Sequence, residues 1–417
     1  MRYDVRNLNL NKVGRDRVEW AYRDMPVLQV IESSFSRKKP LRNINIAACL
    51  HVTTETANLL IVLKKAGANV ACCASNPLST QDDVAAHLVK DYGIATFAIN
   101  GINNKGYYQH IVNSLSVKPN ITMDDGCDLV GLVHKTRGKY LKDIIGGTEE
   151  TTTGVIRLNS MSENKVLSYP IIAVNNAFTK HLFDNRYGTG QSVLDGIIRA
   201  TNRLMSGKTF VVCGYGWCGK GLAMRARGLG AKVVVTEIDS TKALEAKMDG
   251  FEVMTGTEAF KKADFVCSVT GNINVIDKHH FKLLKDGAII SNAGHFNVEI
   301  NIAALRKMSS KKKKIRDDIE EFTLGKKKIY LLSDGRLVNL SAAEGHPSSV
   351  MDMSFANQAF CAEYIAKNYE KLQNKVYDVP LDIDNKVARI KLKSMDVKID
   401  KLTAEQDRYL NSWESGT

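Results

Sequence analysis

The chain has few of the features that mark membrane, secreted or metal-binding proteins. No apolar run approaches the roughly 20 residues that a membrane-spanning helix needs. The first residues, MRYDVRNLNLNKVG, lack the apolar core of a signal peptide. The eight cysteines are scattered and show no CxxC or Cys/His metal spacing. These absences predict a cytoplasmic protein with reduced thiols, no membrane partner and no bound metal.

Motifs for nucleic-acid binding are also lacking, although the chain is basic. The net charge is +13 and the isoelectric point is near 9.2, which by itself suggests a polyanionic partner. However, the excess is partly local, because Lys311–Lys314 and Lys326–Lys328 flank the acidic stretch Asp317–Glu321. No basic motif is interleaved with aromatic residues. We therefore expect a solvated charged surface and no nucleic-acid partner.

The most informative segment that is present is a strand, glycine turn, helix and second strand. A β-branched run at 210–212 leads into Gly214-x-Gly216-x-x-Gly219, and a helical segment follows to about Leu229. A second apolar run, 232–236, ends at Glu237. In this arrangement the first glycine permits a tight turn, the second lets a pyrophosphate approach the backbone, and the third allows close helix packing. The helix N-terminus then offers free amides to the phosphates.

This unit predicts a Rossmann domain that binds NAD. A carboxylate at Glu237 is placed to bind both ribose hydroxyls of NAD, and it would repel the 2′-phosphate of NADP.

A second α/β series occupies the first half of the chain. Buried strands are expected at 43–50, 69–74, 94–99 and 120–123, with helices at 51–66, 82–92 and 107–115 between them. Polar residues follow these strands, where parallel sheets bind ligands. Further strands are expected at 265–269, 288–291 and 329–332, and an apolar helix at 353–368. With 417 residues, the chain is long enough for two or three domains. The predicted fold is α/β, with two doubly wound parallel-sheet domains and a cleft between them.

Several motifs together identify a family. They occur in the order His51-Val-Thr-x-Glu-Thr56, Asn76-x-x-Ser-Thr-Gln-Asp82, Asp124-Asp-Gly-x-Asp128, Glu149-Glu-Thr-Thr-Thr-Gly154, Asn175-x-x-x-Thr-Lys180, Phe183-Asp-Asn-x-Tyr-Gly188, Gly214-Tyr-Gly-x-x-Gly-Lys-Gly221, Asn292-x-Gly-His-Phe296, Val338-Asn-Leu340, Gly345-His-Pro-Ser348 and Asn357-Gln358. With these motifs the chain closely resembles the S-adenosylhomocysteine hydrolases over almost its whole length.

The resemblance implies a domain plan and an assembly. Residues 1–185 and 346–378 would form a discontinuous substrate-binding domain, and 186–345 an NAD-binding Rossmann domain inserted into it. Residues 379–417 would form a C-terminal dimerisation segment of a homodimer or homotetramer. Many members carry a longer Lys- and Tyr-containing tail, and many carry a cysteine where Thr189 stands here.

The resemblance also implies the reaction. Members reversibly hydrolyse S-adenosyl-L-homocysteine to adenosine and L-homocysteine, with tightly bound NAD. Oxidation at C3′ makes the C4′ proton acidic, homocysteine leaves by elimination, water adds, and the 3′-ketone is reduced again.

Catalytic residues are carried over by position. Lys180 and Asp184 match the pair at the 3′-oxygen, Asn185 the residue that orients the lysine, and Glu150 the carboxylate on the ribose hydroxyls. Asp125 matches the acid/base residue near C4′ and C5′, and His51 a histidine near the leaving sulfur. His295, also expected among the catalytic residues, matches a position that lines the cofactor and nucleoside sites. Which of Asp125, His51 or a water molecule carries each proton stays open. A lysine acts as a base only if burial or positive neighbours lower its pKa, and we expect this for Lys180.

Binding residues follow in the same way. The expected substrate contacts are Thr53, Glu55, Leu340, His346, Met351 and Phe355. The expected NAD contacts are Thr151, Thr152, Thr153, Asn185, Gly214, Gly216, Gly219, Glu237, Asn272, Asn339 and His346.

Two polar residues also indicate which base the site would bind, independently of the resemblance. The N6 amine of adenine needs an acceptor, which Glu55 supplies, with the hydroxyl of Thr53 beside it. A carbonyl at C6, as in an inosyl substrate, would need a donor instead. We therefore expect adenosyl over inosyl specificity. The alternatives are an S-inosylhomocysteine hydrolase, an ordinary NAD-dependent dehydrogenase, and a catalytically silent relative that binds NAD and nucleoside.

Overall fold

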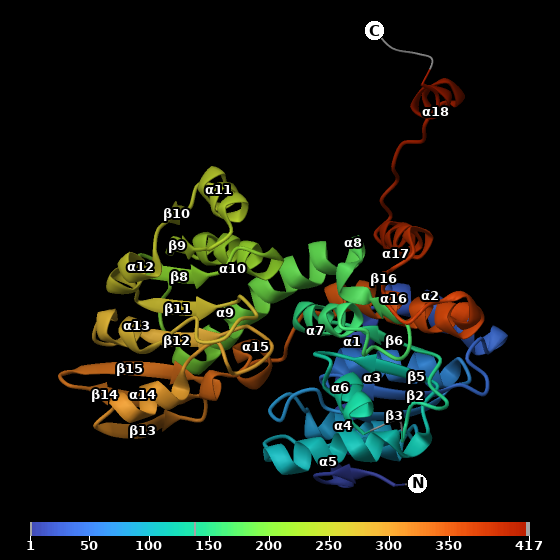
Figure 1. The fold of residues 1–417 in the computed structure, drawn as a ribbon, viewed down its shortest axis with the longest axis horizontal. Helices are drawn as coiled ribbons and strands as arrows, with labels where there is room; N and C mark the ends of the chain where they lie inside the picture. Colours follow the sequence, from blue (N-terminus) through green and yellow to red (C-terminus); the bar gives the residue numbers. More distant parts are fainter. Residues whose placement is uncertain (1, 137–138, 414–417) are drawn as a thin grey trace.

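The protein consists of two α/β lobes that lie side by side (Figure 1). The structure is a computed structural model, and it describes residues 2–136 and 139–413. The first lobe comprises residues 2–180 and 348–394, apart from 137–138, and the second lobe comprises residues 189–341. Two segments cross between them, the π-helix η4 (His181–Gly188) and the loop 342–347. The predicted fold class, two doubly wound α/β domains, is confirmed.

The first lobe is built on an eight-stranded sheet in which all neighbouring strands run parallel. The strands in spatial order are β1 (Asp4–Val5), β4 (Ala95–Ala98), β3 (Asn69–Cys73), β2 (Asn45–Cys49), β5 (Ile121–Asp124), β6 (Gly146–Glu149), β7 (Ile171–Ala173) and β16 (Val376–Asp378). The helices are α1 (Asn11–Arg23), α2 (Pro26–Lys38), α3 (Thr54–Lys65), α4 (Asp82–Lys90), α5 (Asn104–Ser114), α6 (Asp128–Lys135), α7 (Thr152–Glu163), α8 (Phe178–Lys180), α16 (Ser348–Asn368) and α17 (Leu381–Ser394).

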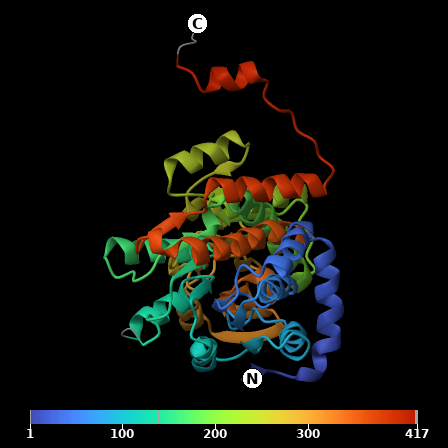
Figure 2. The ribbon, with the colours of Figure 1, turned by 90° about the vertical axis from the view of Figure 1, so that its right-hand side faces the viewer.

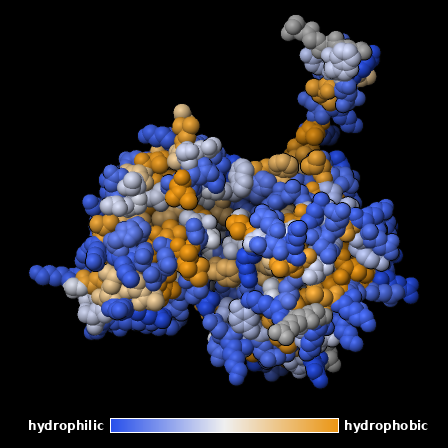
Figure 3. Space-filling view, viewed as in Figure 1, coloured by the Kyte–Doolittle hydropathy of each residue, from blue (hydrophilic) through white to orange (hydrophobic). Residues whose placement is uncertain are grey.

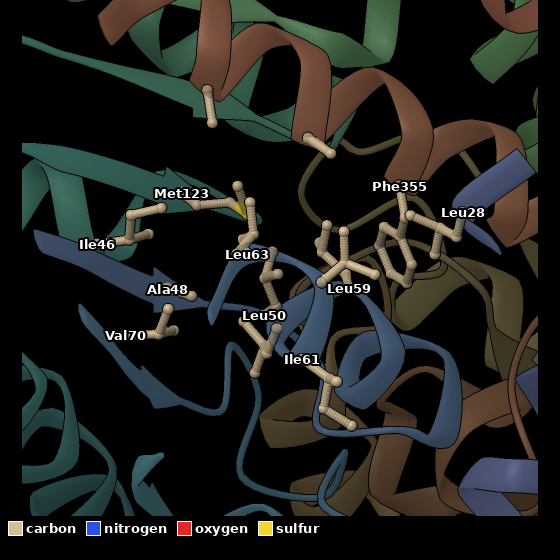
Figure 4. Packing of buried hydrophobic residues seen from close by; sticks show 14 of the residues in the cluster. Leu28, Ile46, Ala48, Leu50, Leu59, Ile61, Leu63, Val70, Met123 and Phe355 are labelled. Atoms are coloured by element: carbon tan, nitrogen blue, oxygen red, sulfur yellow. The ribbon is translucent and has the colours of Figure 1, made fainter. Parts of the chain in front are cut away.

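One hydrophobic core of the first lobe lies between the sheet and helices α2, α3 and α16 (Figure 4), and a second contains residues of α5, α6 and α7. Leu28, Leu59 and Phe355 come from these three helices and lie together, and Leu63 and Met123 lie between them and Ile46 of the sheet. Polar contacts join helix α16 to helices α2 and α17. The carboxylate of Asp352 on α16 accepts hydrogen bonds from backbone amides of α2 and from the Lys391 ammonium of α17. Buried charges are held in this way only when they are fully paired.

The second lobe carries the glycine unit on a mixed eight-stranded sheet. Its strands in order are β10 (Glu252–Val253), β9 (Lys232–Thr236), β8 (Thr209–Cys213), β11 (Phe265–Ser268), β12 (Ile289–Asn292), β15 (Lys327–Leu332), β14 (Ile319–Leu324) and β13 (Lys311–Arg316). The helices are α9 (Thr189–Thr201), α10 (Trp217–Gly228), α11 (Ser240–Met248), α12 (Gly256–Lys262), α13 (Lys278–Leu283), α14 (Ile302–Met308) and α15 (Val338–Ser341).

One edge of this sheet differs from the sequence expectation. The lysine run at 311–314 is exposed to solvent, as expected, but it also forms the edge strand β13 of an antiparallel β13–β14–β15 meander. Lys312 Nζ lies 2.5 Å from Glu320 Oε1 on β14, so the acidic stretch pairs across the strands with the basic one. A lysine-rich edge strand also resists pairing with other sheets.

The C-terminal residues separate into two parts. Helix α17 packs on the first lobe, where Ile383 and Val387 are buried. Residues 395–413, here called the C-terminal arm, project away from both lobes and end in α18 (Ala404–Leu410) (Figure 2). Of the segment 379–417 that was predicted for dimerisation, only the arm therefore stands apart from the lobes. Among the described helices, none has the length and apolar character to cross a bilayer.

Candidate active site

A cavity of about 130 Å³ lies at the junction of the two lobes. The carboxyl ends of three neighbouring strands of the first lobe deliver its acid/base residues. His51 follows β2, Asp125 follows β5, and Glu150 follows β6. Because parallel strands end at the same edge of a sheet, residues far apart in sequence meet there. Helices α3, α8 and α16, the two crossing segments and the second lobe supply the rest of the wall.

The structure brings together every residue that was expected to be catalytic and every expected substrate contact. The cavity lining includes His51, Asp125, Glu150, Lys180, Asp184, Asn185, His295, Thr53, Glu55, Leu340, His346, Met351 and Phe355. Four expected cofactor residues line it, namely Thr151 and Asn339 together with Asn185 and His346, which are already named.

Lys180 occupies the centre of the polar network. Its ammonium lies 3.0 Å from Asp184 Oδ2, donates to Asn185 Oδ1 at 2.6 Å, and lies 3.6 Å from Glu150 Oε1. The π-helix η4 explains this convergence, because its wider turn aligns residues five apart along the helix. Asn185 in turn donates to Asn175 Oδ1 at 3.0 Å, which fixes its amide.

The charge state of Lys180 differs from the expectation. Burial alone would lower the pKa of Lys180, but the carboxylates of Asp184 and Glu150 outweigh it, and the pKa lies above its usual value. The lowered pKa expected for a lysine base is therefore not found, since two acids share the pocket with one cation.

The pKa values of the two neighbouring carboxyl groups, Glu150 and Asp184, shift in opposite directions. Burial raises the pKa of Glu150 to about 8, although Lys180 partly opposes this. Burial would also raise the pKa of Asp184, but Lys180 and His346 lower it below its usual range. Glu150 is thus the carboxyl that can hold a proton near neutral pH, while Asp184 stays ionised.

Asp184 links both crossing segments to α16. His346 Nδ1, in the second crossing, lies 2.6 Å from Asp184 Oδ1, and Ser354 Oγ on α16 donates to Oδ2 at 2.8 Å. His346 Nε2 lies 3.3 Å from Thr189 Oγ1, which donates to Cys218 Sγ at 3.4 Å. Thr189 therefore connects the catalytic network to a thiol at the start of α10.

A second acid/base group faces Lys180 across the cavity. His51 Nε2 lies 3.3 Å from Asp125 Oδ2, and His295 Nδ1 lies 3.7 Å from Asp125 Oδ1. Burial lowers the pKa of His51 to about 4, despite the opposing effect of Asp125. His51 is thus neutral at pH 7.

At the remaining wall, Glu55 is buried in the first turn of α3, whose N-cap is Thr53. Ser348 Oγ donates to Glu55 Oε1 at 2.6 Å, so Oε2 remains for a ligand donor. Met351, Phe355 and Leu340 form apolar walls beside this carboxylate. The arrangement suits a flat base with an exocyclic amine.

The glycine turn of the second lobe has the geometry that a dinucleotide needs. Gly214 has φ +107°, and a Cβ added to Gly219 would lie 2.1 Å from the carbonyl oxygen of Gly214. At Gly216 the corresponding space is open to 4 Å, which leaves room for a phosphate over the start of α10. Glu237 follows β9 and accepts a hydrogen bond from the Tyr215 amide at 2.7 Å, so its carboxylate lies against the glycine turn. The residues present therefore fit NAD.

Three other expected cofactor residues, Thr152, Thr153 and Asn272, do not line the central cavity. Thr152 Oγ1 donates to Asn175 Oδ1, and Thr153 Oγ1 lies 3.3 Å from where a Cβ on Gly271 would stand. Asn272 is exposed beside that glycine. Asn339 Nδ2 donates to Ser192 Oγ, while its Oδ1 has no partner among the described residues. Such an orphaned acceptor is expected where a ligand donor binds.

Sequence reasoning assigned no role to several residues of the site. Gln358 donates to Glu150 Oε2 at 2.5 Å, and Ser354, Ser348 and Cys218 make the contacts described above. The signal for Gln358 and Ser354 was their polarity within the otherwise apolar helix 353–368. Nothing in the local sequence pointed to Cys218.

Comparisons with known proteins agree with this geometry. Residues 185–345 match the model for the S-adenosyl-L-homocysteine hydrolase NAD-binding domain, and residues 2–140 match the model for S-adenosyl-L-homocysteine hydrolase. An adenosylhomocysteinase of Aquifex aeolicus is 59% identical over 418 residues, covering 100% of both chains. Adenosylhomocysteinases of Saccharolobus solfataricus and Gloeothece citriformis are 57% and 55% identical, covering 100% of this chain and 100% and 97% of theirs. At this identity over its full length, the chain belongs to the S-adenosyl-L-homocysteine hydrolase family.

Proposed function

We propose that the protein catalyses the reversible, NAD-dependent hydrolysis of S-adenosyl-L-homocysteine to adenosine and L-homocysteine through a 3′-keto intermediate. The observation that carries this proposal is the buried Lys180 ammonium, held within 3.6 Å of Asp184, Asn185 and Glu150 in a cavity between the lobes. No simple binding protein needs a cation and three polar partners arranged in this way.

NAD would be held by the glycine turn and Glu237 at its adenosine end, and by Thr151, Asn185, Asn339 and His346 at the cavity. When bound, it supplies the hydride acceptor and donor at C3′ of the substrate.

Lys180 and Glu150 act together at the 3′-oxygen. Oxidation of an alcohol requires removal of its hydroxyl proton, yet Lys180 is a cation in this network. Glu150 Oε1 lies 3.6 Å from Nζ and has no hydrogen-bond partner among the described residues. The fraction of Glu150 that is ionised near its pKa of about 8 can take a proton from Lys180, and the neutral amine then takes the proton of the hydroxyl.

Asp125 and His51 act on the opposite side of the substrate. Asp125 takes the C4′ proton once the neighbouring carbon is a ketone. His51 is neutral, and its Nε2 lies 3.3 Å from Asp125 Oδ2, so in the tautomer with the proton on Nδ1 it can accept a proton from the water that adds at C5′.

The site geometry argues against the alternatives. A silent relative needs no intact acid/base set, yet all seven expected catalytic residues line the cavity. An ordinary dehydrogenase leaves the buried Glu55–Ser348 pair without a role, and an inosyl carbonyl would face a carboxylate there.

The test is product release by purified protein with added NAD⁺. Adenosine and thiol are measured from S-adenosylhomocysteine, beside S-inosylhomocysteine. Lys180→Ala should abolish release, while the matched control Lys262→Ala, at an exposed lysine of the second lobe, should retain it. NAD content and circular dichroism of each variant separate loss of chemistry from loss of fold. Release from the inosyl substrate alone would overturn the assignment of the base.

We further propose that residues 186–345 form an NAD-binding domain inserted into a substrate-binding domain of 1–185 and 346–378, and that the protein works as a homodimer or homotetramer. The C-terminal arm supports the second point, because Leu402, Leu410 and Trp413 are exposed on it and apolar residues (orange) gather near its base (Figure 3). Light scattering on a chain that ends at Asp396 tests this, since a smaller assembly than the full chain is expected.

The cytoplasmic location remains a prediction from sequence.

A further inference from the structure

Two buried carboxyl groups lie directly behind the catalytic carboxyls Asp125 and Glu150. Asp124 is the last residue of β5 and Glu149 the last residue of β6, and the two are paired in register. Both side chains are fully buried, and each directly precedes a catalytic residue in the chain. Neither lines the cavity. Any effect that they have on the reaction must therefore act through the residues that they hold.

Glu149 joins the two strand ends through a single oxygen atom. Its Oε1 accepts hydrogen bonds from the Gly126 amide at 2.8 Å and from the Thr151 amide at 3.1 Å. Gly126 directly follows Asp125 in the chain. Thr151 directly follows Glu150, so this oxygen is bound by the residue after each catalytic carboxyl. The hydrogen bonds of one side chain thus connect the turns that carry both groups.

The side chain of Glu149 fits closely against helix α7. A Cβ added to Gly154, in the first turn of this helix, would lie 2.1 Å from Glu149 Cδ. Only a glycine therefore leaves room for the carboxyl group. Thr151 is the N-cap of the helix, and its side chain makes no cap hydrogen bond. Glu149 thus holds the backbone of Thr151, while the side chain of Thr151 stays available at the cavity.

The environment of Glu149 favours its neutral form. Burial, together with the nearby Asp124 and Asp125, raises the pKa of Glu149 well above its usual value. Its Oε2 is buried without a hydrogen-bond partner among the described residues. An ionised oxygen in that position would be uncompensated, which costs more than burying a neutral group. A glutamine, which is neutral and has the same shape, should therefore substitute for Glu149.

We propose that Glu149 is a positioning residue that sets the placement of Asp125 relative to Glu150. This inference rests on the proposed function, in which Glu150 serves oxidation at C3′ and Asp125 takes the C4′ proton. The two groups act on adjacent carbons of one sugar ring, so the distance between them must match the substrate. A displacement of about 1 Å in such an arrangement can lower the rate about 100-fold.

Substitutions of Glu149 test this role by product release from S-adenosylhomocysteine. Glu149→Ala removes both hydrogen bonds and should lower kcat roughly 10–100-fold. KM should change little, because the base contacts of Glu55 lie elsewhere in the cavity. Glu149→Gln keeps an acceptor at the position of Oε1 and should retain kcat. Equal losses in Glu149→Gln and Glu149→Ala would overturn the proposal.

A further variant keeps the test valid where Glu149→Ala does not fold. Glu149→Asp retains a buried acid but draws its oxygens back by one methylene, so it cannot reach both amides. Its kcat should fall, although less than that of Glu149→Ala. A kcat equal to that of the wild type in Glu149→Asp would count against a role in positioning.

Two partial reactions of adenosine with the NAD-loaded protein separate positioning from a general loss of structure. The absorbance of bound NADH reports oxidation at C3′, and deuterium uptake from D₂O, measured by mass spectrometry, reports proton transfer at C4′. Glu149→Ala should slow at least one of them. The matched control Asp264→Ala removes the acceptor of the Thr209 amide, at the end of β8 away from the glycine turn, and should lower Tm while both rates persist. A lower Tm with unchanged partial rates in Glu149→Ala would show that its role is structural only.

The same assays distinguish failure of this inference from failure of the proposed function. If the wild type released no product and formed no NADH, the proposed function would fail, and this inference with it. If the wild type turned over substrate and Glu149→Ala did so equally fast, only this inference would fail.

Discussion

Glu55→Gln changes the substrate preference of this site, and the structure sets the size of the effect. Glu55 is buried in the first turn of α3, where the positive end of the helix dipole stabilises a carboxylate. Ser348 occupies Oε1, so Oε2 is the acceptor left for the N6 amine of adenine. A hydrogen bond to a charged group contributes about 1.5–3 kcal/mol. Its loss lowers kcat/KM for S-adenosylhomocysteine roughly 10–150-fold.

The same substitution offers an amide NH₂ to a carbonyl at C6. Turnover of S-inosylhomocysteine should therefore rise from near zero. The assay measures adenosine and inosine by chromatography at several substrate concentrations for each protein. Glu252→Gln, at an exposed glutamate, is the matched control and should change neither value. An equal fall in kcat/KM for both substrates would refute the assignment of Glu55 to base recognition.

Three other substitutions test separate parts of the site. Burial raises the pKa of Glu150 to about 8, above its unfolded value. The stability that its protonated form provides is therefore lost as pH rises through about 8. Glu150→Gln should raise Tm relative to the wild type at about pH 9 and should change Tm little below about pH 5. Glu237→Ser removes a carboxylate that would repel a 2′-phosphate, and titration with NAD⁺ and NADP⁺ should show their dissociation constants converging by roughly tenfold or more. Asp384→Ala removes the acceptor for the Phe178 and Thr179 amides that begin α8, and urea unfolding should show a loss of about 2–4 kcal/mol together with a lower kcat.

The glycine unit was predictable because its information is local. The turn at Gly214, the close approach at Gly219 and the acid after β9 all follow from spacing within one βαβ unit, and the structure has strands at 209–213 and 232–236. The buried strands of the first lobe were predictable for a similar reason, since parallel strands covered on both faces are apolar runs.

The meander at the far edge of the second sheet was not predictable in this way. Strand β13 is exposed along its whole length and carries four consecutive lysines, so it shows no alternation of apolar and polar residues. Its partner β14 carries the acidic residues that pair with it. Cross-strand charge pairs hold this register, and a reading based on hydrophobic periodicity does not detect them.

The charge state of Lys180 could not be predicted from the sequence, for a different reason. Lys180 and Asp184 are close in the chain, whereas a helix and a strand separate Glu150 from them. Glu150 lies close to Lys180 Nζ only because it follows a strand that ends at this edge of the first sheet. The sum of burial and two carboxylates decides the sign of the pKa change, and that sum exists only in the folded protein.

The Lys180–Asp184 contacts and the Asp125–His295 contact lie at different places in the fold, and they serve different steps of the proposed reaction. Asp184 contacts Lys180 and His346, so one carboxylate joins both segments by which the chain crosses between the lobes. A rotation of the lobes about these crossings would change distances least at the crossings themselves. By contrast, His295 and Asp125 lie on different lobes with no crossing segment between them, and their separation depends directly on lobe closure. We infer that the groups for oxidation at C3′ keep their geometry while the lobes move, and that His295 joins Asp125 and His51, which both lie on the first lobe, only on closure. Closure would at the same time enclose the substrate and shield it from water.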